Sequence, residues 1–96
     1  MVFKYQLEIT EDAQQNIDNI YDYIKCSLFN EQSAEKLTKK FFKAFEQVCC
    51  FPNSKTKYKD YRKIVVDNYL IFYKVDKLKK TIIIMRVYHG SQDYDI

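Results

Sequence analysis

Residues 61–88 read YRKIVVDNYLIFYKVDKLKKTIIIMRVY, and this stretch decides the fold. Three runs rich in β-branched and aromatic residues predict three strands, at Arg62–Val66, Tyr69–Val75 and Thr81–Tyr88. Residues 67–68 predict a tight turn between the first two strands, and residues 76–80 a longer turn before the third. Because Ile82–Met85 is apolar on both faces, we expect the third strand to lie inside a sheet and not at its edge.

Two amphipathic helices are predicted upstream of these strands. Thr10 is the expected N-cap of the first helix, which runs to about Leu28 and has acidic residues in its first turn, where the helix dipole favours them. Asn30 is the expected cap of the second helix, which ends at Pro52 because a proline pushes the preceding residue out of the helical region. Apolar residues recur at helical spacing in both: Ala13, Ile17, Ile20 and Ile24 in the first, and Ala34, Leu37, Phe41, Phe45 and Val48 in the second.

A further strand is expected near the N-terminus, because Phe3, Tyr5, Leu7 and Ile9 alternate with polar residues. Residues 53–60 are polar and basic and are expected to form a loop. The predicted order is βααβββ in a single domain spanning residues 1–96. This is an α+β fold, with a helical hairpin packed on one face of a largely antiparallel four-stranded sheet. The other face is expected to be open and concave, and to receive a partner or substrate.

The net charge of +3 is unevenly distributed along the chain. Residues 1–35 carry a balance of −5, residues 36–80 a balance of +9, and residues 81–96 a balance of −1. Such polarity can steer one face of a protein toward a polyanion or an acidic protein. Lysine-rich helix faces that simply contact solvent would explain the same numbers.

Nothing in the sequence indicates secretion, membrane insertion or metal binding. The N-terminus lacks the apolar core of a signal peptide, and the longest apolar run is too short to cross a bilayer. Cys26, Cys49 and Cys50 are odd in number and do not pair with histidine at a metal-ligand spacing, so we interpret them as small buried apolar side chains. We therefore expect a cytoplasmic protein without a metal ion, a cofactor or a small-molecule ligand.

Several short strings, in their order and spacing, resemble the RelE/ParE toxins of type II toxin–antitoxin systems over nearly the whole chain. The strings are residues 9–13 with Ile17, Ile20, Tyr21 and Ile24, then Phe51-Pro52, residues 61–66, residues 68–76 and residues 86–94. The resemblance implies a toxin that blocks a macromolecular machine of its own cell. It also implies a cognate antitoxin that wraps the toxin with helical and extended segments. A member that has lost its toxicity is a further alternative.

The superfamily contains two classes of toxin with different activities. RelE-like and YoeB-like members are ribosome-dependent ribonucleases that cut messenger RNA, whereas ParE-like members inhibit DNA gyrase and are not nucleases. Nuclease members commonly have an arginine that holds the scissile phosphate at the second position of a Tyr-Arg-Leu-Val-Tyr-like string, where this chain has Leu70. Losing one such donor costs on the order of 10²–10³ in rate. Together with the ending formed by His89, Gly90 and Asp93, Leu70 favours a ParE-like toxin that acts by binding and not by catalysis.

The alternative is a nuclease, and RNA cleavage would then need a general base, a general acid and cations. The candidate catalytic residues under this alternative are His89, Arg86, Tyr94 and Arg62. His89 is the only histidine, and a structural role is the competing interpretation. By strand alternation, Arg86 is expected to share a face with Ile84 and Tyr88. Its guanidinium would either bind a phosphate or pair with a carboxylate such as Asp93.

A basic and aromatic segment provides the candidates for contact with the target. These residues are Lys55, Lys57, Lys59, Tyr61 and Lys63. Lysines interleaved with tyrosines can hold a nucleic-acid backbone and stack on bases, although an exposed basic loop has the same composition. The expected partners are therefore a cognate antitoxin and either DNA gyrase or the ribosome with its messenger RNA.

Overall fold

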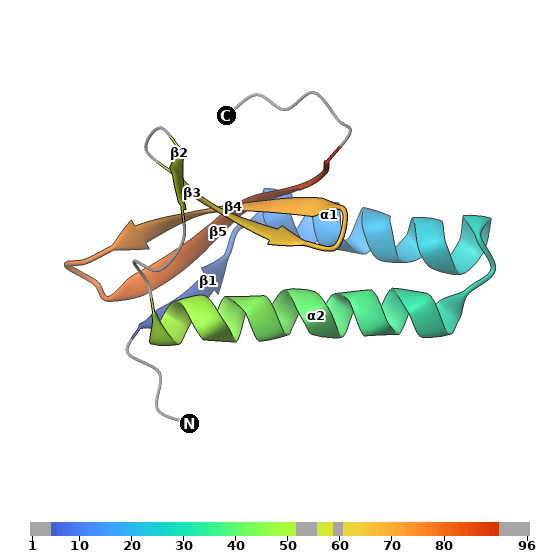
Figure 1. The fold of residues 1–96 in the computed structure, drawn as a ribbon, viewed down its shortest axis with the longest axis horizontal. Coiled ribbons are helices and arrows are strands. Elements are labelled where there is room, and N and C mark those ends of the chain that lie inside the picture. Colours follow the sequence, from blue (N-terminus) through green and yellow to red (C-terminus); the bar gives the residue numbers. More distant parts are fainter. Residues whose placement is uncertain (1–4, 52–55, 59–60, 91–96) are drawn as a thin grey trace.

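The computed structural model describes residues 5–51, 56–58 and 61–90 (Figure 1). Its elements are β1 (Gln6–Ile9), α1 (Glu11–Asp22), the π-helical turn η1 (Tyr23–Ser27), α2 (Glu31–Cys50), β2 (Thr56–Tyr58), β3 (Tyr61–Val66), β4 (Tyr69–Asp76) and β5 (Thr81–His89). The predicted helical hairpin and all four predicted strands are present, so the α+β fold is confirmed. Phe3, Pro52, Asp93 and Tyr94 lie outside the described residues.

Helix α1 begins at the predicted N-cap. The Thr10 side-chain oxygen accepts a hydrogen bond from the Ala13 N–H at 3.1 Å, which satisfies one of the free donors of the first turn. The same hydroxyl donates to the carbonyls of Ile84 and Met85 at 3.0 and 3.1 Å. Thr10 therefore starts the helix and also fixes its position against β5.

The hydrogen-bond pattern of the first helix changes before the helix ends. In η1 the Leu28 N–H bonds to the Tyr23 carbonyl at 3.3 Å, five residues back instead of four. The chain then reverses at Phe29, whose φ is 52° and whose side chain is 91% exposed. Asn30 caps α2 as predicted, since its side-chain oxygen accepts from the Ser33 N–H at 3.0 Å. The tip of the hairpin extends past the end of the sheet (Figure 1).

Helix α2 buries the predicted apolar stripe. All five of its members are buried, together with Ala44, Cys49 and Cys50. Cys26 is different: it lies in η1 and is exposed, so the prediction of three buried thiols is wrong at that position. Burial raises the pKa of the Cys49 thiol, which keeps it protonated and unreactive at neutral pH.

The sheet has the strand order β1-β5-β4-β3-β2. β1 pairs with β5 in parallel, and the other neighbouring pairs are antiparallel. As predicted, β5 lies inside the sheet, between β1 and β4. The loop predicted over residues 53–60 is wrong at Thr56–Tyr58, where β2 adds a short edge strand beside β3. Its polar residues gave no apolar alternation from which a strand could be predicted.

Both predicted turns between strands are present. Asp67, with a φ of 52°, and Asn68 connect β3 to β4. In the turn before β5, the Asp76 carboxylate accepts from the N–H groups of Leu78 and Lys79, both at 3.1 Å. These side-chain bonds hold the turn in a fixed shape.

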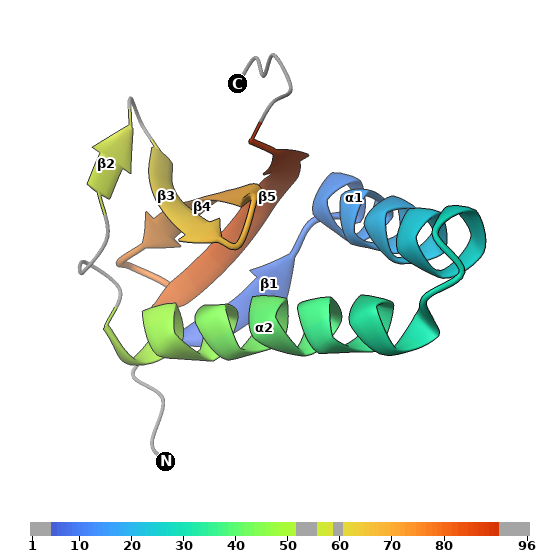
Figure 2. The same ribbon diagram turned by 45° about the vertical axis from the view of Figure 1, so that its right-hand side comes forward.

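The hydrophobic core lies between the helices and one face of the sheet. In Figure 2, α2 passes beneath the sheet and α1 lies beside β5. The sheet contributes Ile64, Ile71, Tyr73, Ile82, Ile84 and Val87 to this core. Tyr73 is fully buried, and within the described part of the chain its hydroxyl has no hydrogen-bond partner. The two helices thus cover one face of the sheet and not the other.

Candidate functional site

A β-bulge in β5 decides which side chains reach the face without helices. Phe72 pairs with Arg86, but the next residue, Tyr73, pairs with Ile84, so Met85 is an extra residue. From Arg86 onward, the bulge exchanges the two faces of the sheet to which alternate side chains of β5 point. The prediction that Arg86 shares a face with Ile84 is therefore wrong, because simple alternation does not allow for an inserted residue.

The strand register identifies the residues of this face, because directly opposed residues in antiparallel strands point the same way. We call it the helix-free face. It comprises Tyr61, Lys63 and Val65 of β3, Leu70, Phe72 and Lys74 of β4, and Ile83, Arg86 and Tyr88 of β5. Phe72 is fully buried, and its ring meets the Tyr88 ring edge-on with the ring centres 6.0 Å apart. Val65, in contrast, is 62% exposed. The face combines cationic, aromatic and aliphatic side chains.

Arg86 is held at one edge of the helix-free face by an ion pair with α1. Its guanidinium nitrogen lies 2.7 Å from an Asp12 carboxylate oxygen and donates to the Met85 carbonyl at 2.9 Å. Of the two roles predicted for Arg86, the structure shows an ion pair, with Asp12 as the partner; the carboxylate suggested from the sequence, Asp93, lies outside the described residues. A guanidinium occupied in this way is less available to a phosphate.

Two other candidate catalytic residues, Arg62 and His89, lie on the opposite face, and Tyr94 is outside the described residues. Arg62 is paired with Tyr73 and His89 with Tyr69, which places both on the side of the helices and four positions apart along β4. The His89 and Tyr69 rings meet edge-on at 5.2 Å. The described members of the predicted catalytic set therefore do not converge on one point.

Leu70 lies on the helix-free face between Val65 and Tyr88, its partners on the two neighbouring strands. It lines a shallow depression of about 370 Å³ at the end of the sheet, with Val65, Asp67, Asn68, His89 and Gly90. Gly90 fits closely here, because a Cβ atom at this position would lie 3.0 Å from the Asn68 carbonyl oxygen. The position discussed for a phosphate-binding arginine thus holds an aliphatic side chain, and neither Lys nor Arg lines the depression around it.

The basic segment predicted to contact the target is divided between the edge and the face of the sheet. Lys57 lies in β2, opposite Arg62, whereas Lys55 and Lys59 lie outside the described residues. Tyr61 and Lys63 are on the helix-free face. Lys74 joins them, since its Nζ lies 4.8 Å from the centre of the Tyr61 ring. Sequence analysis missed Lys74, although its alternation with Leu70 and Phe72 would have indicated this face.

Two further findings concern metals and membranes. Within residues 5–51, 56–58 and 61–90, no three His, Cys, Asp or Glu side chains are grouped so that they could hold a metal ion. Neither helix in those ranges is long and apolar enough to cross a membrane.

Comparison with known proteins gives one family match. The model of the ParE toxin of the type II toxin–antitoxin system parDE matches residues 7–94. No curated protein sequence matches the chain.

Solved structures share the fold at low sequence identity. A chain of the chromosomal ParDE TA system from P. aeruginosa has a TM-score of 0.75 and 18% identity, with 90% of this chain and 96% of that chain covered. A chain of the RelBE toxin–antitoxin complex from Mycobacterium tuberculosis has a TM-score of 0.59 and 14% identity, with 90% and 98% covered. The isolated E. coli RelE toxin has a TM-score of 0.57 and 20% identity, with 93% and 87% covered. At these identities the similarity shows the fold alone.

Proposed function

The chain belongs to the ParE toxin family of type II toxin–antitoxin systems, and on this premise we propose that it arrests growth by binding DNA gyrase and not by cleaving RNA. A cognate antitoxin neutralises it by covering the toxin, as the similarity to chains of ParDE and RelBE systems suggests. The observation that carries the proposal is Leu70, an aliphatic side chain where nuclease members place a phosphate-binding arginine.

The positions of the ionisable side chains support binding over cleavage. RNA cleavage requires an acid, a base and a cation around one phosphate. Here Arg86 is paired with Asp12 on one face, while Arg62 and His89 lie on the other. A binding protein needs no such convergence.

We assign target contact to the helix-free face. Lys63 and Lys74 give it positive charge, and Val65 and Leu70 give it apolar area that a partner can bury. A face with cations around an apolar centre suits an acidic protein surface or an enzyme bound to DNA.

The purified protein is expected to inhibit DNA supercoiling by gyrase. Lys63→Glu and Lys74→Glu should each weaken this inhibition about ten-fold, the equivalent of about 1.4 kcal/mol of binding energy. Lys77→Glu is the matched control, because it makes the same charge change in the exposed turn after β4, away from the helix-free face. Equal loss in all three variants would refute the assignment of the face.

A second assay separates the two classes of toxin. The protein is incubated with ribosomes that are translating a defined message, and the RNA is examined for cuts. The proposal predicts intact RNA. Efficient cleavage within codons, abolished by His89→Ala or Arg86→Ala, would overturn it and establish the nuclease alternative.

A further inference from the structure

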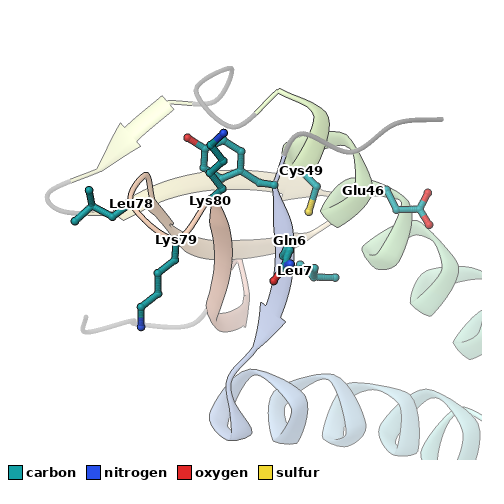
Figure 3. Close-up of a pocket in the computed structure, with 8 residues that line it drawn as sticks. Gln6, Leu7, Glu46, Cys49, Leu78, Lys79 and Lys80 are labelled. Carbon is teal, nitrogen blue, oxygen red and sulfur yellow. The ribbon is translucent and has the colours of Figure 1, made fainter.

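A larger hollow lies where the start of β1, the end of α2 and the turn between β4 and β5 meet (Figure 3). We call it the β1 bowl. Its volume is about 760 Å³, and its lining residues are Tyr5, Gln6, Leu7, Glu46, Cys49, Leu78, Lys79 and Lys80. This volume lies within the range of about 300–1,000 Å³ found for ligand sites in proteins. None of these residues belongs to the helix-free face as defined above.

Exposed apolar side chains form part of the β1 bowl. Leu78 is 98% exposed, and Leu7 is 39% exposed although it lies in a strand. Figure 3 shows Leu7 and Cys49 on one side of β1 and Leu78 on the other. The nearly buried Cys49 offers a thiol that stays neutral because burial raises its pKa. Covering the two leucines would remove apolar surface from water, which favours a ligand with apolar side chains of its own.

The charges of the β1 bowl indicate which polar groups the ligand should carry. Figure 3 shows Leu78 and Lys79 on one side of β1 and Glu46 on the other. Lys80 adds a second cation to the lining. A carboxylate next to Lys79 would therefore be favoured, and an acidic group near Glu46 would be repelled.

The backbone of β1 can also bond to a peptide. The Gln6 N–H bonds to the Lys80 carbonyl at 2.7 Å, and the Thr10 N–H bonds to the Ile84 carbonyl at 3.1 Å. Since alternate residues of a parallel strand bond to the same neighbour, the N–H and C=O of Leu7 point away from β5. β1 is an edge strand, and on its outer edge the Tyr5 N–H bonds to the Cys49 carbonyl of α2 at 3.0 Å. The next groups along this edge, those of Leu7, are the ones that the backbone of an extended peptide could use.

We propose that the β1 bowl receives an extended segment of the partner antitoxin, with apolar side chains against Leu7 and Leu78 and a carboxylate beside Lys79. The inference rests on the proposed function, which supplies the antitoxin as a partner. A second copy of this chain is less suited, because it carries the same net charge of +3. Two exposed leucines also provide far less area than the roughly 800 Å² per partner that a stable dimer interface buries.

Synthetic peptides test the proposal on the purified full-length chain. The probe is an acetylated, amidated hexapeptide of two aspartates, two leucines, a valine and a serine. Two control peptides replace either the aspartates by lysines or the apolar residues by serines. Binding at low salt is followed by amide chemical shifts in a ¹⁵N-labelled sample. The acidic apolar peptide should shift the amides of Leu7, Cys49 and Leu78, and should bind more than about five-fold more tightly than either control.

Variants of the exposed turn link this binding to the β1 bowl. Lys79→Glu and Leu78→Ser should each weaken the peptide about five-fold, which is the scale of one partly exposed contact. Lys77→Glu, in the same turn but outside the lining, and Val65→Ser, on the helix-free face, should leave it unchanged. All these side chains are exposed or half-exposed, so the variants are expected to fold.

Several outcomes would overturn the proposal: equal binding of acidic and basic peptides, equal effects of Lys79→Glu and Lys77→Glu, or shifts confined to the helix-free face. The peptide assay contains neither gyrase nor ribosomes, so its failure would leave the proposed target untouched. Conversely, Lys79→Glu and Leu78→Ser should retain full gyrase inhibition, and this result separates the antitoxin surface from the target surface.

Discussion

At the scale of single residues, Tyr73 carries the clearest energetic cost. Its hydroxyl is buried and has no hydrogen-bond partner among the described residues. An unpaired buried polar group costs about 1–3 kcal/mol. Tyr73→Phe removes the hydroxyl and keeps the ring, so it should raise the free energy of unfolding by about 1 kcal/mol in urea denaturation. A loss of stability would show that the hydroxyl has a partner after all.

The same side chain predicts a dependence of stability on alkaline pH. Burial raises the pKa of Tyr73 from its ordinary value of 10 to about 12, and the nearby Arg62 charge offsets part of this rise. Between these values the folded state keeps a proton that the unfolded state has lost. The stability of the fold is therefore independent of Tyr73 ionisation below pH 10 and falls as the pH rises toward 12.

In that window Tyr73 should lower the free energy of unfolding by roughly 1.4 kcal/mol per pH unit. Denaturation of the wild type and of Tyr73→Phe at about pH 9 and about pH 11 measures this difference. The advantage of the phenylalanine variant should widen at the higher pH. A constant difference between the two proteins would contradict the raised pKa.

At the scale of elements, the contact between α1 and β5 depends on Thr10. Its hydroxyl caps α1 and donates to the carbonyls of Ile84 and Met85 at the bulge. Thr10→Ala should therefore cost about 2 kcal/mol, at the upper end for a cap. Asn30→Ala is the matched control, because the Asn30 side chain caps α2 and, among the described residues, forms no hydrogen bond with β5; it should cost about 1 kcal/mol. Equal costs in thermal or urea unfolding would mean that the contact with β5 contributes little.

The elements with regular periodicity could be predicted from sequence, because burial of one face leaves a pattern over several residues. The stripe from Ala34 to Val48 and the strands around Ile71 and Ile84 are examples, and all are buried as expected. The extra residue Met85 could not be predicted, since one inserted residue in an apolar run leaves no mark on the pattern. Because of that single residue, Arg86 and Ile84 lie on opposite faces of the sheet.

The candidate site was predictable only in part for a related reason. Tyr61 and Lys63 could be proposed from a local run of basic and aromatic residues. Their neighbour Lys74 comes from another strand, and its position over Tyr61 depends on the pairing of β3 with β4. The pairing of Arg86 with Asp12 joins residues far apart in sequence, which no local pattern records.

At the scale of the whole molecule, charge is unevenly distributed between segments of the chain. The first helix, α1, has acidic residues in its first turn and no basic residue in its last, whereas residues 36–80 carry a balance of +9. Binding that depends on this separation should weaken with salt, because the screening length falls from about 30 Å at 0.01 M to about 10 Å at 0.1 M. Inhibition of gyrase should therefore require several-fold more protein at the higher salt, with Lys77→Glu behaving like the wild type. Salt-independent inhibition would argue against the cationic helix-free face.

The central claim is that this toxin binds its target and leaves RNA intact. The most direct measurement is to express the protein without its antitoxin and map the 5′ ends of cellular transcripts while growth is arrested. We predict arrested growth, induction of the DNA-damage response and transcripts without new ends inside codons. Growth arrest accompanied by abundant new ends at defined codon positions, lost in His89→Ala, would contradict the claim.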